Sequence, residues 1–149
     1  MIVPDINLLI YAYNSDAAHH SQARAWWETL LNGRDPVGIP WVVSLGFVRL
    51  MTHPAVLLTP LEPRIAVNHV RTWLGRPQVE VLAPGPRHLE ILDLLFRAVG
   101  VAASLTTDAH IAALAIECQG EVHSSDADFG RFPGLRWHNP LSSPGSAPR

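Results

Sequence analysis

The first thirteen residues, MIVPDINLLIYAY, place one acidic side chain between two apolar segments. Residues 1–3 predict a short strand, and Leu8, Leu9 and Ile10 begin an apolar helix. Asp5 lies between them, where a buried carboxylate is costly unless it is paired or holds a metal. If the strand is central in a parallel sheet, Asp5 lies at its carboxyl end, where open α/β sheets bind ligands. The rest of the chain must therefore supply partners for this acid.

Short apolar strands alternate with helices along the remaining sequence. The expected strands cover 1–3, 37–39, 78–82, 121–124 and 135–137. The expected helices cover 17–32, 41–51, a segment opening at 59–62, 88–99 and 109–119. Asp16 is expected to cap the first of these helices, and Thr59 with Glu62 to form a capping box. This alternation predicts an α/β domain with a mostly parallel sheet, in which helix exceeds strand.

Length and composition favour one globular domain. The chain has 149 residues, of which 48% are hydrophobic, and we assign 1–141 to the domain and the polar segment 142–149 to a disordered tail. No apolar run approaches the ~20 residues of a membrane helix, and no export signal is evident. The single cysteine, Cys118, favours a reducing compartment. We therefore expect a cytoplasmic protein without membrane contact.

Acidic residues recur at matching positions of the expected elements. Asp5 follows the first strand, Asp108 begins a helix, and Asp126 and Asp128 follow the strand at 121–124. Parallel connections bring such points to one edge of a sheet. Clustered carboxylates repel each other unless a cation is present, and Mg²⁺ or Mn²⁺ suits oxygen ligands. The set predicts a site for phosphoryl chemistry, although each acid taken alone is typical of a turn or a helix cap.

Four motifs in order carry a resemblance to a known family. They are DINLL at 5–9, GFVRLMT at 46–52, TDAHIAALA at 107–115, and SSDADF at 124–129 followed by FPGLRW at 132–137. The chain resembles the PIN-domain ribonucleases, and in particular the VapC-type toxins of bacterial type II toxin–antitoxin systems. The match runs from residue 1 to about residue 141, which is nearly the whole chain.

The resemblance implies a Rossmann-like, PIN-like domain of about five mostly parallel short strands flanked by helices. It implies an endoribonuclease that depends on Mg²⁺ or Mn²⁺ and cleaves transfer, ribosomal or messenger RNA by a metal-activated water. It also implies a homodimer and a cognate antitoxin protein as partner. The family's site positions correspond to Asp5, Asp108 and Asp126 as metal ligands and catalytic residues, Asp128 as a further catalytic acid, and Asn7 and Ser125 as supporting residues.

One departure from the family pattern lies in the second helix. The family usually carries a glutamate there, whereas this chain has Gly46 or a neighbour, and no acid occurs between Asp35 and Glu62. The site is then expected to hold one metal instead of two, to be slower, or to be completed by Asp128. Arg49 in the same helix is a candidate for contact with an RNA phosphate, the alternative being an arginine that covers a helix face.

Two other functions remain open from the sequence. One is a phosphatase of the HAD-like kind with Asp5 as nucleophile, although such families usually need a second aspartate where this chain has Asn7. The other is a catalytically degenerate PIN-like module, which binds its partner or RNA and leaves RNA uncut.

Overall fold

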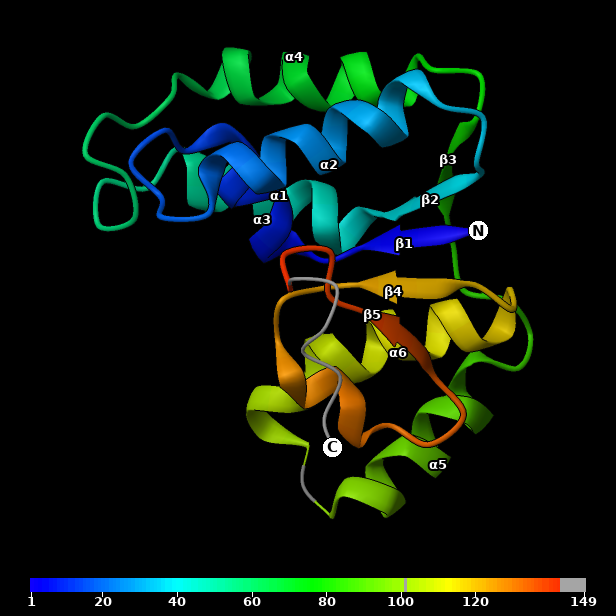
Figure 1. Ribbon diagram of the computed structural model, residues 1–149. Coiled ribbons are helices and arrows are strands. Elements are labelled where there is room, and N and C mark those ends of the chain that lie inside the picture. Colours follow the sequence, from blue (N-terminus) through cyan, green and yellow to red (C-terminus); the bar gives the residue numbers. More distant parts are fainter. Residues whose placement is uncertain (101, 143–149) are drawn as a thin grey trace.

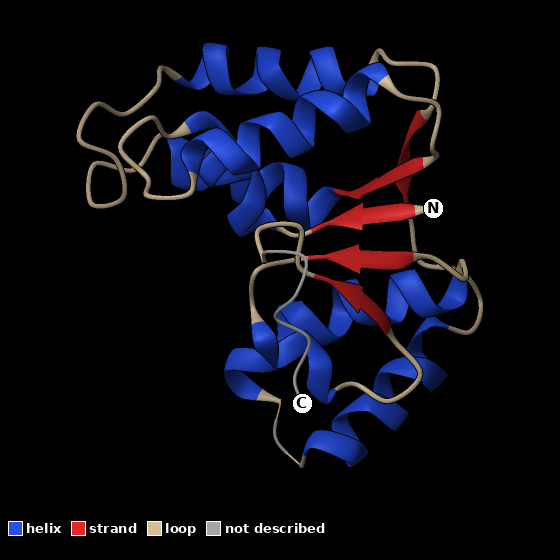
Figure 2. Cartoon of the chain, in the orientation of Figure 1, coloured by secondary structure: helices blue, strands red, loops and turns tan. Residues whose placement is uncertain are grey.

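The chain folds around a five-stranded parallel sheet in the order β3-β2-β1-β4-β5. The computed structural model describes residues 1–100 and 102–142, so nearly all of the predicted tail lies outside the described residues. The strand arrows run in the same direction (Figure 2). The strands are β1 (Ile2–Pro4), β2 (Val37–Pro40), β3 (Val79–Leu82), β4 (Glu121–His123) and β5 (Arg136–His138). The predicted α/β class with parallel strands is confirmed.

Helices flank the sheet in two groups (Figure 1). One group lies beside β1–β3 and comprises α1 (Ile6–Tyr13), α2 (His20–Asn32), α3 (Trp41–Met51) and α4 (Pro63–Leu74). The other lies beside β4 and β5 and comprises α5 (His88–Val99) and α6 (Thr106–Glu117). Two short 3₁₀ helices, η1 (Ala103–Leu105) and η2 (Ala127–Arg131), precede α6 and follow β4. Within the described part of the chain, no helix combines the length and apolarity needed to cross a membrane.

Pro4 occupies the last position of the central strand although proline has no N–H to donate. The Ile2 N–H donates to Pro36 O beside β2, and the Asp5 N–H donates to His123 O on the β4 side. The alternation of a parallel strand therefore turns the Pro4 nitrogen toward β2. The β1–β2 pairing is registered only at Ile2, so the missing donor costs no ladder bond.

Helix α6 begins at Thr106, three residues before its predicted start. Two other predicted helix starts are also wrong, and both have a local cause. Helix α2 begins at His20 instead of residue 17, and the Asp16 N–H donates to the Asn14 side chain within a turn. Helix α4 begins at Pro63, with Glu62 extended at φ −64° and ψ 142°. A residue before proline is pushed out of the α region, so the helix cannot begin at the predicted capping box.

An aromatic cluster joins the first four helices. The Trp73 ring lies 4.6 Å from Phe47 and 5.4 Å from Trp27, centroid to centroid. Trp73 Nε1 also donates to the Tyr13 hydroxyl at 2.8 Å. These contacts connect α4 to α1, α2 and α3, and they hold the far end of the helix that begins after Asp5.

Candidate active site

Asp5 links the central strand to helix α1. Its Oδ1 accepts from the Ile6 N–H at 2.7 Å, which caps the helix, and its Oδ2 accepts from Ser124 Oγ at 2.8 Å. The residue is 4% exposed. Burial raises the pKa of this carboxyl above its ordinary value, while the two hydrogen bonds partly oppose the rise. The carboxylate therefore has a fixed orientation at the carboxyl end of β1.

Ser124 connects Asp5 to the acids that follow β4. Its fully buried hydroxyl donates to Asp5 and accepts from the Asp126 N–H at 3.0 Å. Asp126 in turn caps η2 by accepting from the Asp128 N–H at 2.9 Å. The backbone of Ser124 is held as well, because its carbonyl accepts from Trp137 Nε1 at 2.9 Å. The turn after β4 thus presents Asp126 beside Asp5.

Asp108 completes the group from the first turn of α6. Its pKa rises from 3.8 to about 7, first because it is half-buried and then because Asp5, Asp126 and Asp128 add negative potential. The four predicted acids therefore lie close enough to interact electrostatically. Such a group is unfavourable without a positive charge, and this makes the edge of the sheet a candidate cation site.

The donor set fits a hydrated hard cation better than a closed metal cage. In residues 1–100 and 102–142, no three Asp, Glu, His or Cys side chains converge closely enough to hold an ion by themselves. Mg²⁺ keeps several waters and usually takes only one or two direct carboxylates. Asp108 lies half-buried within the negative potential of Asp5, Asp126 and Asp128, and this grouping of acids is the observation that favours such an ion here.

The supporting contacts come from Ser124, which the sequence did not single out. Asn7 is exposed on α1, and Ser125 is only partly buried. In the described structure, no hydrogen bond joins either side chain to one of the four carboxylates. The physical reason is position: Ser124 directly follows β4 with its side chain fully buried, and the next residue lies in the turn. The two adjacent serines before Asp126 were the sequence feature from which this supporting residue could have been found.

The helix that lacks the family's glutamate packs closely on α1. A Cβ at Gly46 would lie 2.6 Å from Cδ1 of Ile6, so the Ile6 side chain already fills the space beside this position. Arg49 is exposed in the last turn of α3 and makes no ion pair among the residues described. Asp128 is the additional acid near the other three, and it also contacts Arg131 at 3.7 Å.

The raised pKa of Asp108 predicts a pH dependence of stability in the metal-free protein. Between 3.8 and about 7, the folded chain holds a proton that the unfolded chain has lost, so stability falls as pH rises. We expect the thermal midpoint in EDTA to fall between pH 5 and pH 8, and to fall less in Asp108→Asn. Circular dichroism melts at several pH values measure this. Equal pH slopes in the two proteins would contradict the assignment.

Comparison with known proteins places the chain in a family. The sequence profile of the PIN domain matches residues 2–135. The chain therefore belongs to the PIN domain family. Ribonuclease VapC33 of Mycobacterium tuberculosis is 45% identical over 141 residues, which cover 95% of this chain and 99% of that protein. Ribonuclease VapC37 of the same species is 41% identical over 140 residues, covering 94% and 97%. The VapC type inferred from the motifs is confirmed.

Solved structures agree with this fold. VapBC2 from Rickettsia felis, bound to a promoter DNA fragment, superposes with a TM-score of 0.64 at 18% identity, covering 93% of this chain and 98% of that one. VapBC-1 from nontypeable Haemophilus influenzae gives 0.65 at 15% identity, covering 95% and 100%. At these identities the likeness concerns the fold alone.

Proposed function

We propose that this chain is a metal-dependent endoribonuclease and the toxin of a toxin–antitoxin pair. The observation that carries the proposal is the meeting of Asp5, Asp108 and Asp126 at one sheet edge, where burial, followed by the charges of Asp5, Asp126 and Asp128, raises the pKa of Asp108 to about 7. Relatives that align along nearly the whole chain are named ribonucleases, which supports the same activity for a site of this composition.

In this proposal Asp5, Asp108 and Asp126 hold Mg²⁺ or Mn²⁺ directly or through water, and Asp128 assists. The bound ion would activate a water and offset the charge that develops on the departing oxygen. The protein's part is orientation: the Ile6 N–H and Ser124 Oγ fix both oxygens of Asp5. Hydrolysis forms a bond from water oxygen to phosphorus and breaks the bond to one ribose oxygen, without a covalent enzyme intermediate.

Partners follow from the same proposal. VapBC assemblies are among the structures of similar fold, which supports a cognate antitoxin for this chain. We also propose a homodimer, cytoplasmic location, RNA as substrate and Arg49 as a contact for RNA phosphate. The phosphatase alternative has less support, because the relatives that align along nearly the whole chain are named ribonucleases.

The test is cleavage of total cellular RNA by the purified chain, free of antitoxin. Parallel reactions contain Mg²⁺, Mn²⁺ or EDTA. We expect discrete fragments with either ion and none with EDTA, and mapping of the fragment ends would reveal the RNA that is cut. Uncut RNA in all three reactions, from a protein shown to be folded by circular dichroism, would overturn the proposal and favour the degenerate binding module.

A further inference from the structure

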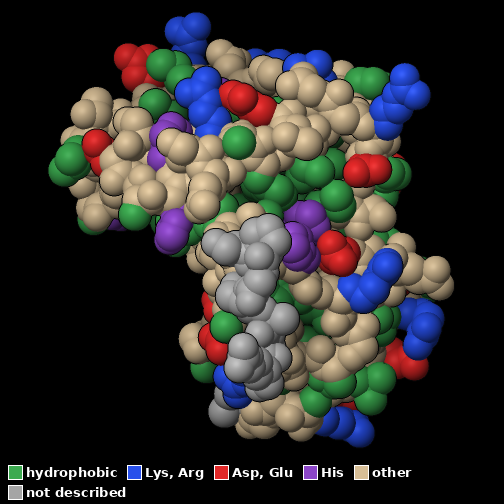
Figure 3. Space-filling model, viewed as in Figure 1, with side chains coloured by type: hydrophobic (Ala, Val, Ile, Leu, Met, Phe, Trp, Pro, Cys, Tyr) green, Lys and Arg blue, Asp and Glu red, His purple; other side chains and the backbone are tan. Residues whose placement is uncertain are grey.

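The end of strand β4 is held from the side of helix α2. Side chains alternate between the two faces of a sheet along a strand, so Glu121 and His123 lie on one face, while Ser124 points to the other and contacts Asp5. Figure 3 shows histidine and acidic side chains gathered where Figure 1 places β4 and β5. His123 is 7% exposed. A buried polar ring next to the candidate site needs hydrogen-bond partners, and these partners show what the ring holds.

The His123 imidazole is hydrogen-bonded at both of its nitrogens. Trp26 Nε1, on α2, lies 3.0 Å from Nδ1, and Glu121 Oε1 lies 2.8 Å from Nε2. The indole N–H can only donate, so Nδ1 accepts from Trp26, and Nε2 carries the hydrogen that is donated to Glu121. One tautomer of the neutral ring therefore satisfies both bonds. The ring is fixed between helix α2 and its own strand.

The backbone of His123 contacts the candidate site directly. Its carbonyl accepts from the Asp5 N–H at 2.9 Å, just beyond the last pair of β1 and β4, which is Pro4 with His123. The next residue, Ser124, carries the hydroxyl that donates to Asp5 and accepts from the Asp126 N–H. A shift of His123 therefore moves two of the groups that orient Asp5 and, through Ser124, the position of Asp126.

Strand β4 has few main-chain bonds with which to fix its own end, because it is three residues long. On the β5 side, the Ser124 N–H donates to the His138 carbonyl at 3.1 Å, but β5 is itself an edge strand of three residues. Helix α2, in contrast, has 13 residues, and Trp27 and Leu30 are buried in the core. The bond from Trp26 therefore joins the end of β4 to a more firmly packed element.

We infer that Trp26 and His123 are positioning residues for the carboxylate site. In the described structure, neither side chain is hydrogen-bonded to one of the four acids. Their bond holds the end of β4 where Ser124 reaches Asp5, and it thereby fixes the spacing of Asp5 and Asp126 for a cation. Without this bond the carboxylates remain, but their spacing is less well defined and the cation binds less tightly. The inference rests on the proposed metal-dependent function.

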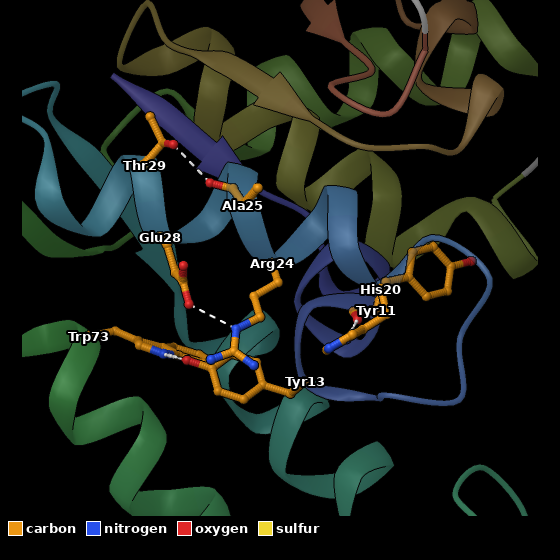
Figure 4. A network of polar contacts seen from close by, with 8 residues as sticks. All are labelled: Tyr11, Tyr13, His20, Arg24, Ala25, Glu28, Thr29 and Trp73. Carbon is orange, nitrogen blue, oxygen red and sulfur yellow. Dashed lines mark hydrogen bonds and ion pairs between the residues drawn. The ribbon is translucent and has the colours of Figure 1, made fainter.

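The test is the affinity for Mn²⁺ alone, measured from the electron paramagnetic resonance signal of the free ion. Trp26→Phe keeps an aromatic ring and removes the N–H. The matched control is Trp73→Phe, which likewise removes one indole N–H, the one that donates to Tyr13 at 2.8 Å (Figure 4), at the opposite end of α1 from Asp5. We expect the affinity to fall about tenfold in Trp26→Phe, the lower end of the loss typical of contacts behind metal ligands, and to stay at the wild-type value in Trp73→Phe. Equal affinities in all three proteins would show a merely structural role and overturn the inference.

Two substitutions of His123 separate the two bonds of its side chain. The side-chain oxygen of Asn takes roughly the place of Nδ1 and can accept from Trp26, whereas the side-chain nitrogen of Gln takes roughly that of Nε2 and can donate to Glu121. We expect His123→Asn to keep most of the wild-type affinity for Mn²⁺, and His123→Gln to lose as much as Trp26→Phe. The reverse order would assign the positioning to Glu121 and overturn the role of Trp26.

Hydrogen exchange separates a failure of this inference from a failure of the proposed function. The amide hydrogens of Asp5 and Asp126, which donate to the His123 carbonyl and to Ser124 Oγ, are followed by NMR in the metal-free protein. We expect both to exchange faster in Trp26→Phe than in Trp73→Phe, because the end of β4 opens locally. If wild type binds no Mn²⁺, the proposed function fails, and the exchange rates alone decide whether Trp26 positions the acids. Faster exchange in Trp26→Phe supports this role, and equal rates in the two variants overturn it.

Discussion

The Asp5→Asn variant is expected to cleave RNA about a thousandfold more slowly than wild type. Removal of one electrostatic group that stabilises a transition state typically costs 10²–10³ in rate. Here the group is also expected to hold the ion, so the larger end of that range applies. Asn supplies a neutral oxygen in place of a carboxylate, and hard cations bind it less strongly. Rates measured with a defined RNA fragment in Mg²⁺ provide the test.

The same substitution is expected to leave the fold intact. Asn can accept from the Ile6 N–H and donate to Ser124 Oγ, the two groups that contact Asp5 now. Burial already disfavours the charged carboxylate, so its removal should not lower the thermal midpoint. Asp16→Asn is the matched control, because Asp16 is exposed in a turn. Cleavage by Asp5→Asn within tenfold of wild type would remove Asp5 from the site.

The Ser124→Ala variant is expected to lose both activity and stability. The hydroxyl donates to Asp5 and accepts from the Asp126 N–H while fully buried. Alanine leaves both partners unsatisfied, at a cost of about 1–3 kcal/mol in the free energy of unfolding. Loss of such a supporting contact typically reduces metal affinity or activity about 10–100-fold. Urea unfolding and cleavage rates at saturating Mg²⁺ measure the two effects.

Ser125→Ala is the comparison that makes this prediction specific. The family resemblance assigns support to Ser125, whereas the hydrogen bonds belong to Ser124. We expect Ser125→Ala to change the free energy of unfolding by no more than about 0.5 kcal/mol and to cleave RNA at the wild-type rate. A larger loss of activity in Ser125→Ala than in Ser124→Ala would reverse the assignment.

The sheet and the meeting of the acids were predictable because both depend on short-range pattern. Apolar strand segments separated by amphipathic helices determine a parallel sheet, and residues just after its strands meet at one edge. Helices α3 and α5 have the predicted bounds because Pro40 and Gly100 limit them. The predicted starts of α2 and α4 were wrong because neither helix has a side-chain cap: α2 begins after His19, and Pro63 determines where α4 begins.

The details of side chains were beyond prediction from sequence. Which of two adjacent serines points inward depends on where β4 ends, a matter of one residue. The close packing of Ile6 against Gly46 depends on how α1 lies on α3. The bond from Trp26 to His123 joins residues that are 97 positions apart in the sequence. Each of these features arises from tertiary packing, for which the local pattern carries no signal.

The central claim is that Asp5, Asp108 and Asp126 together hold a hard divalent cation, directly or through water. The most direct measurement is a crystal structure of the wild-type protein grown with Mn²⁺, with diffraction recorded at the manganese absorption edge. We predict an anomalous peak beside these three carboxylates, and its absence in crystals of Asp5→Asn grown in the same way. A fully occupied peak elsewhere, or none at the carboxyl edge of β1 and β4, would contradict the account.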